Sequence, residues 1–464
     1  MEKAPGDGKR LHPSPKAQRE VKLSQAGGGK AGGAKAGLGN LRCAGDNRLV
    51  RIAMISYHTC PLATLGGKDT GGMNVYVRDL TRELGRRGVG VDVFTRSQDE
   101  HVPHVLHDLG YGNRIVHVPA GPETPMAKDR LVDYLPTFIE TIVDFASTKN
   151  IRYDILHSHY WLSGLAALEL RARWGLPVIH MFHTLAAMKN RVARDDEEPG
   201  STIRLEAEGR LLRQADRIVA ATQAELAQFQ WLYHVDTRRV AVIPPGVDTG
   251  HFYPIPADEA REFAGVPPEK RMLLFVGRVE PLKGIDSLLQ AIAILRAHDA
   301  DLGRQLCLAV IGGEAGDEGL SETDEMSRLQ ELRSGLHIED MVTFLGRRAQ
   351  DTLPYYYSAA EVVVVPSHYE SFGLVALEAM ACGTPVVASE TGGLAFLVRD
   401  GETGFHVPTA DPEALAERLR QLLGDELLRE RLGQQASEYA KRYAWPLMAE
   451  QIIALYHGAI GVHA

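Results

Sequence analysis

From Leu49 onward, short runs of β-branched and other apolar residues alternate with segments of helical periodicity. The run at 51–56 reads as a strand, and Val77, Leu80 and Leu84 then recur at the spacing of one helix face. Further strands are predicted at 91–95, 114–118, 155–159, 178–183, 217–221 and 240–243. Alternating strands and helices predict a mostly parallel sheet that helices cover on both faces.

The alternation of strands and helices stops at residues 244–268, which are rich in proline. A second series of strands and helices follows. Its strands are predicted at 271–276, 306–311, 341–345, 361–365 and 385–388, and two helices at 412–423 and 426–442. The fold class is therefore α/β, with two Rossmann-like, doubly wound domains facing a central cleft. The predicted parts are a tail at 1–48, a first domain at 49–250, a linker at 251–270, a second domain at 271–442 and a last helix at 443–464, which Pro446 interrupts.

Composition narrows the class of protein. The 464 residues are 44% hydrophobic and 24% charged, which is typical of a soluble globular protein. No apolar run reaches the roughly 18 residues of a membrane span, and the N-terminus lacks the pattern of a secretory signal. The scattered cysteines Cys43, Cys60, Cys307 and Cys382 suggest no disulfide framework. Together these features indicate a cytoplasmic protein without integral membrane contact.

The net charge of −9 is unevenly distributed. Residues 1–48 carry +6 and the remaining chain −15. The tail is rich in Gly, Ala, Lys and Pro and is predicted to be disordered. An acidic body argues against nucleic acid as a partner, and the sequence leaves the role of the tail open.

A glycine-rich turn at 66–72 follows the first strand. It matches neither the GxGxxG pattern of dinucleotide sites nor a P-loop. Gly71 and Gly72 place backbone N–H groups at the start of a helix, where a phosphate or a polar sugar can bind. A tight turn without a ligand explains the same residues.

Arg278 follows the strand at 271–276, and Lys283 is expected in the first turn of the next helix. A cation there opposes the helix dipole, at a cost of roughly 0.3–1 kcal/mol. Two cations at the carboxyl end of a sheet are explained by an anion between them, with a diphosphate the natural candidate. Two solvated surface charges are the alternative.

The segment from Glu370 to Glu378 is the most specific local indication of a ligand site. Glu378 is the only charged residue between Phe372 and Ser389, in a helix expected to be buried. Its carboxylate therefore needs a partner, either ribose hydroxyls or a buried Arg or Lys. Ser371 is the expected N-cap, and the N–H groups of Ser371, Phe372 and Gly373 could meet a phosphate or sugar oxygen. A structural ion pair for Glu378 and a surface position for Glu370 are the alternative.

Four histidines fall at the ends of two predicted strands. Alternation puts His157 and His159 on one strand face, but no carboxylate cluster accompanies them, so no metal ligands are assigned. His159 and His183 are interpreted as polar cleft residues that touch a sugar. His157 and His180 are interpreted as core or surface residues.

These features together resemble the retaining family 4 glycosyltransferases of the GT-B fold, over about residues 50–460, and the resemblance implies that the last helix at 443–464 crosses back onto the N-terminal domain. The matching motifs are Gly-Gly after the first strand, Pro-Pro-Gly-Val-Asp at 244–248, Arg278 with Lys283, and Glu370 with Glu378. Within that family, the stretches at 71–76, 157–164, 182–185 and 189–190 are similar to inositol-phosphate N-acetylglucosaminyltransferases. The same regions, with 204–208 and 121–122, are similar to sucrose-phosphate synthases.

The resemblance implies a site for a phosphorylated acceptor. Lys128, Tyr160, Thr184 and Arg204 would grip its phosphate, and Asn74 would lie near its hydroxyls. Two cations and two hydroxyls suit a phosphate in chemical type. Residues 191–203 are acidic and depart from the family pattern, and only Arg204 stands where paired arginines are expected.

The resemblance also implies the reaction: transfer of a sugar from a UDP-sugar, UDP-N-acetylglucosamine by preference, to 1L-myo-inositol 1-phosphate with retained configuration. Arg278 and Lys283 would stabilise the departing diphosphate, Glu378 would bind the ribose and Glu370 the donor sugar. Gly72 and residues 371–373 would donate from the backbone, with His183 beside the reacting sugar. With these cations no metal cofactor is needed for that step, although a role for Mg stays open.

Three other functions stay open at this stage. They are a sucrose-phosphate synthase, a glycosyltransferase of lipid acceptors at a membrane surface, and a nucleotide-sugar binding protein without catalysis. Donor base, sugar, acceptor and oligomeric state, including a homodimer, are not fixed by the sequence.

Overall fold

The computed structural model describes residues 50–64, 70–192, 202–313 and 324–463. All of these described residues belong to one compact unit. The predicted tail at 1–48 with Cys43, and residues 66–69 of the glycine-rich turn, lie outside the described residues. None of the described helices is long and apolar enough to cross a membrane.

Eight strands form the first sheet, in the order β3-β4-β2-β1-β5-β6-β7-β8. They are β1 (Arg51–Ile55), β2 (Gly90–Arg96), β3 (Val105–Leu106), β4 (Arg114–Val118), β5 (Ile155–His159), β6 (Val178–Met181), β7 (Arg217–Ala220) and β8 (Val240–Val242). All neighbours pair in parallel except β3 with β4. Every strand but β3 lies within two residues of its predicted bounds. β3 has two residues, too few to show a periodic pattern.

Helices connect these strands, and together they make what we call the N-terminal lobe. They are α1 (Gly72–Arg86), α2 (Lys128–Leu131), η1 (Val132–Tyr134), α3 (Leu135–Thr148), α4 (Trp161–Trp174), α5 (Ala186–Val192), α6 (Thr202–Gln214), α7 (Gln223–Tyr233) and η2 (Thr237–Arg239). The central strands are buried along their length, as expected for a parallel sheet with helices on both faces.

A second, six-stranded sheet has the order β11-β10-β9-β12-β13-β14 and is parallel throughout. Its strands are β9 (Arg271–Val276), β10 (Leu306–Ile311), β11 (Val342–Gly346), β12 (Val362–Val365), β13 (Val386–Ser389) and β14 (Gly404–Val407). The sequence prediction missed β14, an edge strand that contains a glycine and a histidine among its four residues.

The helices around this sheet complete the C-terminal lobe. They are α8 (Ala257–Ala264), η3 (Pro281–Lys283), α9 (Ile285–His298), α10 (Ala300–Gln305), α11 (Asp324–Gly335), η4 (Gln350–Thr352), α12 (Leu353–Ala359), α13 (Leu374–Ala381), α14 (Leu394–Leu397), α15 (Pro412–Gly424) and α16 (Glu426–Ala440). The two sheets match the doubly wound α/β class expected from the sequence.

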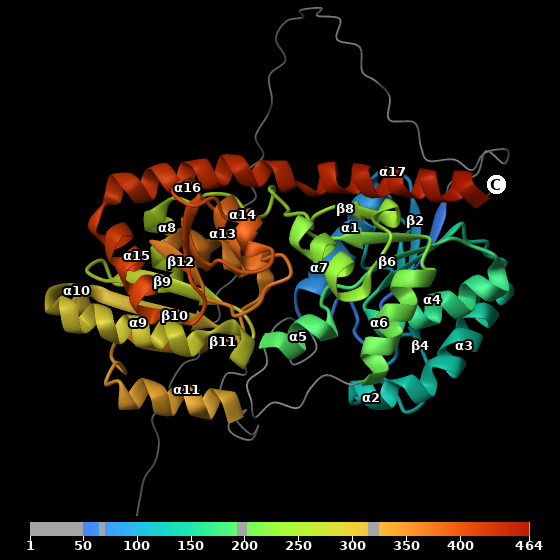
Figure 1. Ribbon diagram of the computed structural model, residues 1–464, viewed down its shortest axis with the longest axis horizontal. Coiled ribbons are helices and arrows are strands. Elements are labelled where there is room, and N and C mark those ends of the chain that lie inside the picture. Colours follow the sequence, from blue (N-terminus) through green and yellow to red (C-terminus); the bar gives the residue numbers. More distant parts are fainter. Residues whose placement is uncertain (1–49, 65–69, 193–201, 314–323, 464) are drawn as a thin grey trace, which may run out of the picture. The chain divides into compact units, whose positions relative to one another are not determined.

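The chain then returns from the C-terminal to the N-terminal lobe. A short turn η5 (Lys441–Tyr443) separates α16 from α17 (Trp445–His463), and the two helices run one after the other in Figure 1. Pro446 lies in the first turn of α17, so the prediction that it interrupts the last helix is wrong. A proline fits there because the first helical N–H groups need no intrahelical acceptor.

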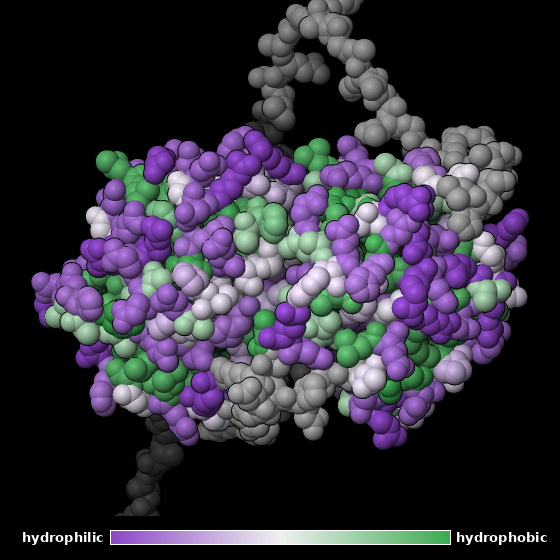
Figure 2. Space-filling view, in the orientation of Figure 1, coloured by the Kyte–Doolittle hydropathy of each residue, from purple (hydrophilic) through white to green (hydrophobic). Residues whose placement is uncertain are grey.

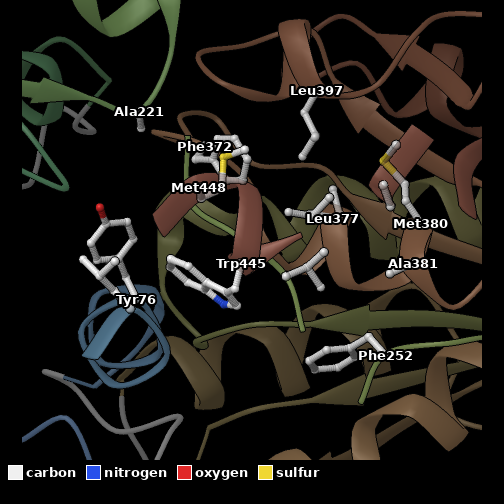
Figure 3. Close-up of a cluster of buried hydrophobic side chains, with 14 of the residues drawn as sticks. Tyr76, Ala221, Phe252, Phe372, Leu377, Met380, Ala381, Leu397, Trp445 and Met448 are labelled. Atoms are coloured by element: carbon white, nitrogen blue, oxygen red, sulfur yellow. The ribbon is translucent and has the colours of Figure 1, made fainter. Parts of the chain in front are cut away.

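Apolar side chains of both lobes and of α17 share one core (Figure 3). The ring of Trp445 lies 5.4 Å from the ring of Tyr76 in α1, edge on. A methyl group added to Gly246 would come within 2.5 Å of the Trp445 ring, so this crossing has no spare room. On the side seen in Figure 2, polar side chains cover most of the surface and apolar ones form small groups.

Candidate functional site

A cavity of about 320 Å³ is lined by residues that follow strands of both sheets. His183 follows β6 of the N-terminal lobe, while Arg278 follows β9 and Glu370 follows β12 of the C-terminal lobe. The cavity thus lies at the carboxyl ends of the strands, where doubly wound folds bind ligands. His159 does not line it, but all the residues predicted to bind the donor or the acceptor or to act in catalysis do: Gly71, Gly72, Asn74, Lys128, Tyr160, His183, Thr184, Arg204, Arg278, Lys283, Glu370, Ser371, Phe372, Gly373 and Glu378.

The two predicted diphosphate cations each face a carboxylate. Lys283 Nζ lies 2.5 Å from Glu370 Oε2, and Arg278 Nη2 lies 2.9 Å from Glu280 Oε1. All four side chains are partly exposed, so an anion can compete for both cations. A methyl group on Gly71 would lie 3.8 Å from Arg278 Nε, which brings the start of α1 close to this guanidinium.

The sequence predicted Lys283 in the first turn of the helix that follows β9. The structure places it before α9 instead. Pro281–Lys283 form the separate 3-10 turn η3, which ends at Gly284 with φ +64°. A methyl group there would meet the carbonyl oxygen of Pro366 at 2.1 Å. Only glycine both takes this conformation and tolerates the contact, so the turn that carries Lys283 requires glycine at position 284.

The segment before α13 also differs from the prediction. The helix begins at Leu374, and its N-cap is Gly373 with φ +103°, so Ser371 is not the N-cap. A methyl group on Gly373 would come within 2.5 Å of Leu394 Cδ2. The backbone N–H groups of residues 371–373 therefore precede the helix, on a loop that borders the cavity.

Glu378 has a different partner from those expected. Its Oε2 accepts a hydrogen bond of 2.8 Å from the Tyr357 hydroxyl, rather than from a buried Arg or Lys. The residue is 7% exposed, and burial raises the pKa of its carboxyl to about 7. The side chain of Gln350 also donates to this carboxylate, so both of these donors are neutral groups.

The residues of the expected acceptor site, spread over 76 positions of sequence, are brought together around Tyr160. Lys128 Nζ lies 5.5 Å and Arg204 Cζ 4.8 Å from the centre of the Tyr160 ring. Arg204 Nη2 donates to the Thr184 carbonyl at 2.8 Å and to Thr184 Oγ1 at 3.1 Å, and its Nε donates to Glu208 at 2.7 Å. Glu208 is fully buried and so fixes the guanidinium from behind.

Asn74 lines the cavity, but its side chain is engaged within the protein. Its Nδ2 donates to Thr59 Oγ1 and to the Cys60 carbonyl, at 2.8 and 2.7 Å, and its Oδ1 accepts from the Gly71 N–H at 2.9 Å. These bonds hold the loop between β1 and α1. They leave one acceptor position of the amide for a ligand.

His183, His159 and His157 lie in a row that begins at the cavity, and all of them but His183 are buried. His183 lines the cavity, with φ +63°, and its Nε2 lies 3.0 Å from Nδ1 of His159. His159 is fully buried and does not line the cavity, so the prediction that it touches a sugar is wrong. His157 shares its strand face, as alternation predicts, and its Nδ1 contacts the Tyr456 hydroxyl of α17 at 2.7 Å. Burial lowers the pKa of both His157 and His183 to about 3.

Several lining residues were not singled out from the sequence, among them His58, Lys189, Arg347, Arg348 and Gln350. His58 follows the first strand. Because polar residues at the carboxyl end of a parallel strand are candidates for a ligand site, the sequence could have identified it. The others lie on loops and short helices whose positions no local pattern fixes. Among the described residues, no group of three or more His, Cys, Asp or Glu side chains could hold a metal ion.

Comparisons with known proteins cover nearly the whole described chain. The family described as "Glycosyl transferases group 1" matches residues 256–439, and "Glycosyltransferase Family 4" matches residues 70–251. A curated protein of Actinosynnema mirum named D-inositol 3-phosphate glycosyltransferase is 41% identical over 88% of this chain and 96% of its own length. One of the same name from Geodermatophilus obscurus is 42% identical over 88% and 89%.

Solved structures share the fold. The sucrose-phosphate synthase of Thermosynechococcus elongatus superimposes with a TM-score of 0.81, at 35% identity over 89% of this chain and all of that one. An Anabaena protein in complex with UDP and glucose has a TM-score of 0.68 at 20% identity over 88% of this chain, and so bears on the fold alone.

Proposed function

The chain belongs to the group 1 and family 4 glycosyltransferases and is a hexosyltransferase of the GT-B fold, and from this premise we propose that it moves a sugar from a UDP-sugar to an inositol phosphate. The proposed donor is UDP-N-acetylglucosamine and the acceptor is 1L-myo-inositol 1-phosphate, which is D-inositol 3-phosphate. The configuration at the sugar is retained.

One observation carries this proposal. The Lys128, Tyr160, Thr184 and Arg204 group and the Arg278 and Lys283 pair line the same cavity, the first from the N-terminal and the second from the C-terminal lobe. Two separate groups of cations suit two phosphorylated substrates bound at once. The printed names of the relatives at 41–42% identity support inositol phosphate as the acceptor.

In the proposed mechanism, Arg278 and Lys283 take the diphosphate and stabilise the charge that grows on it as the glycosidic bond breaks. Nucleotide binding would draw Lys283 from Glu370, and the freed carboxylate would accept hydrogen bonds from hydroxyls of the donor sugar. Glu378 would accept from the ribose hydroxyls. The N–H groups of Gly72 and of residues 371–373 would donate to phosphate or sugar oxygens.

His183 would lie beside the reacting sugar as a neutral imidazole, since burial holds its pKa near 3. It would orient the sugar rather than carry a proton at neutral pH. The reaction would proceed on one face of the sugar, with the departing phosphate taking the acceptor proton. Closure of the lobes would exclude water and so limit hydrolysis of the donor.

A second candidate is sucrose-phosphate synthase, which transfers glucose from UDP-glucose to fructose 6-phosphate. The solved structure of that name, at 35% identity and complete coverage, favours it. Both functions need the same phosphate grip on the acceptor. They differ in the sugar ring and acceptor ring that the cavity admits.

A donor-by-acceptor matrix tests the proposal. UDP-N-acetylglucosamine and UDP-glucose are each combined with 1L-myo-inositol 1-phosphate, fructose 6-phosphate, unphosphorylated myo-inositol and liposomes that contain phosphatidylinositol. UDP release gives the rate and NMR of the product gives the anomeric configuration. We expect the first donor with inositol 1-phosphate to be fastest, with an α-linked product, and the rate to persist in EDTA.

Other outcomes would replace the proposal. Preference for UDP-glucose with fructose 6-phosphate would assign a sucrose-phosphate synthase, and turnover on liposomes alone would assign a lipid acceptor. UDP binding without turnover on any acceptor would assign a binding protein. A β-linked product would contradict the retaining mechanism.

A further inference from the structure

His159 is a buried residue near the cavity to which the mechanism gives no role. It is the last residue of β5, which pairs in parallel with β6, and it lies opposite Met181. His183 comes two residues after Met181 and lines the cavity. The Nδ1 atom of His159 lies 3.0 Å from Nε2 of His183, so the two rings are hydrogen-bonded to each other.

His183 has a backbone conformation that its surroundings must impose. Its φ of +63° lies in the left-handed region, which is unfavourable for a residue with a side chain and persists only where other contacts fix it. Its ring is held from two sides. His159 forms the hydrogen bond on one, and on the other the Tyr76 ring lies edge on, with the centroids 5.2 Å apart.

The hydrogen bond also links the protonation of the two rings. Desolvation lowers the pKa of His183 to about 3 and holds the pKa of His159 well below its usual value, so both imidazoles are neutral at physiological pH. A neutral imidazole has one N–H and one bare nitrogen, and a hydrogen bond between two ring nitrogens needs one of each. The bond therefore determines whether Nδ1 of His183, the polar atom of that ring left for a ligand, donates or accepts.

This hydrogen bond is the only one that the His159 ring makes among the described residues. Its other nitrogen, Nε2, is buried without a partner there, and the whole side chain is fully buried. A buried imidazole with an unpaired nitrogen costs stability relative to an apolar ring of similar size. Because His159 does not line the cavity, its bond with His183 is what an imidazole provides here and an apolar ring does not.

We propose that His159 is a positioning residue, which holds the His183 ring in one orientation and in one tautomer beside the donor sugar. This inference rests on the proposed function, in which His183 orients that sugar. A sugar hydroxyl both donates and accepts, so it can pair with either form of Nδ1. A fixed form gives the bound sugar one geometry, whereas an exchanging ring divides the sugar between two.

Three variants test this role. His159→Phe keeps an aromatic ring in the core and removes both nitrogens, while His159→Asn keeps a donor and an acceptor near the position of Nδ1. His157→Phe is the matched control. His157 is also buried and lies on the same strand and face, but its ring contacts the Tyr456 hydroxyl instead of His183.

Kinetics and nucleotide binding separate positioning from a general loss of structure. We expect His159→Phe to lower kcat for sugar transfer about 10- to 100-fold, with the substrate pair that the donor-by-acceptor matrix identifies. The Kd for UDP should stay within twofold of the wild type, because the proposed place of His183 is beside the sugar rather than the nucleotide. His159→Asn should recover part of kcat, and His157→Phe should stay within threefold of the wild type.

Nitrogen NMR of the histidine rings adds a readout that needs no turnover. The N–H and the bare nitrogen of a neutral imidazole resonate far apart, and a ring that exchanges between tautomers gives intermediate shifts. The signals of His183 are identified by their loss in His183→Gln. We expect His183 to show one tautomer in the wild type and in His157→Phe, and averaged shifts in His159→Phe.

The inference is overturned if His183 already exchanges between tautomers in the wild type, or if folded His159→Phe keeps the single tautomer. A kcat of His159→Phe within threefold of the wild type would overturn it as well. If the wild type turns over no pair of substrates, the proposed function fails, while the spectra still decide whether His159 fixes the His183 ring.

Discussion

At the scale of single residues, the sequence identified the charged motifs better than it identified the residues that contact them. Arg278, Lys283 and Glu378 were singled out from the sequence because two cations at a strand end and a lone carboxylate in an apolar helix are unusual without a partner. The sequence could not reveal that Tyr357 is the partner of Glu378, since the two are far apart in the chain and tyrosine is no obvious counterpart to a carboxylate. The prediction that His159 touches a sugar was wrong for a related reason. Strand alternation predicts on which face of the sheet a residue lies, but not whether it is buried below the cavity.

Glu378 carries a prediction about pH. Its pKa is raised to about 7 in the folded chain, whereas an unfolded glutamate titrates near 4.3. The folded state therefore holds a proton that the unfolded state has lost, and the cost grows as pH rises from about 4.5 to 7. Relative to the wild type, Glu378→Gln should gain roughly 3 kcal/mol of unfolding free energy across that window.

Urea denaturation at pH 5 and pH 8, without nucleotide, measures this difference. Glu378→Gln should lie near the wild type at pH 5 and be more stable at pH 8. The exposed Glu262→Gln serves as the control and should shift neither value. A glutamine variant that is less stable at pH 8 would show that the ionised carboxylate is stabilised by its surroundings.

At the scale of elements, strands were predicted well because most of the buried parallel strands are short, mainly apolar runs of three to seven residues. The two missed strands, β3 and β14, are short and lie at sheet edges, where pairing depends on neighbours rather than on local pattern. Helix starts near the cavity were predicted less well. Glycines at positive φ, Gly284 and Gly373, displace the starts of α9 and α13 from the expected positions.

Gly284 and Gly265 make a matched pair for testing how η3 positions Lys283. Both have φ between +64° and +67°, but a methyl group on Gly265 meets nothing within 4 Å, while one on Gly284 meets the Pro366 carbonyl. Gly265→Ala should cost about 1 kcal/mol for the left-handed backbone alone and keep full kcat. Gly284→Ala should cost more and lower kcat at least tenfold, because the turn that carries Lys283 must shift.

Unfolding curves and steady-state rates of the two variants check this expectation. Equal losses of stability with unchanged kcat in both would mean that the contact with Pro366 does not determine where Lys283 lies.

At the scale of the whole molecule, the sequence indicated two sheets and a returning helix, and both are present. What it could not supply is the packing of α17, where Trp445 meets Tyr76 and the Tyr456 hydroxyl meets His157, because these contacts join residues hundreds of positions apart. Those contacts tie the last helix to α1 and to β5, a strand that carries buried histidines.

The N-terminal lobe should be the acid-sensitive part of the protein. Five histidines, His58, His157, His159, His180 and His183, all have pKa values lowered by desolvation, and all of them but His183 are buried. Unfolding raises each toward 6.5, so the unfolded chain takes up protons below that pH and the unfolding free energy falls as pH drops from about 6.5 toward 4. Glu378 and Glu225 act in the opposite sense, since their pKa values are raised to about 7.

The slope of the unfolding free energy against pH near 5.5 measures the net number of protons that the protein takes up on unfolding. We expect a net uptake of at least about two protons on unfolding. Stability that is flat or rises as pH falls through this range would mean that the histidines are protonated in the folded chain.

The central claim is that the pair of cations on the C-terminal lobe drives departure of the nucleotide. The most direct measurement is kcat of Lys283→Ala for sugar transfer from UDP-N-acetylglucosamine to 1L-myo-inositol 1-phosphate, with exposed Lys441→Ala as control. The account predicts a fall of about 10²- to 10³-fold for Lys283→Ala and no change for Lys441→Ala. A folded Lys283→Ala enzyme within threefold of the wild-type kcat would contradict it.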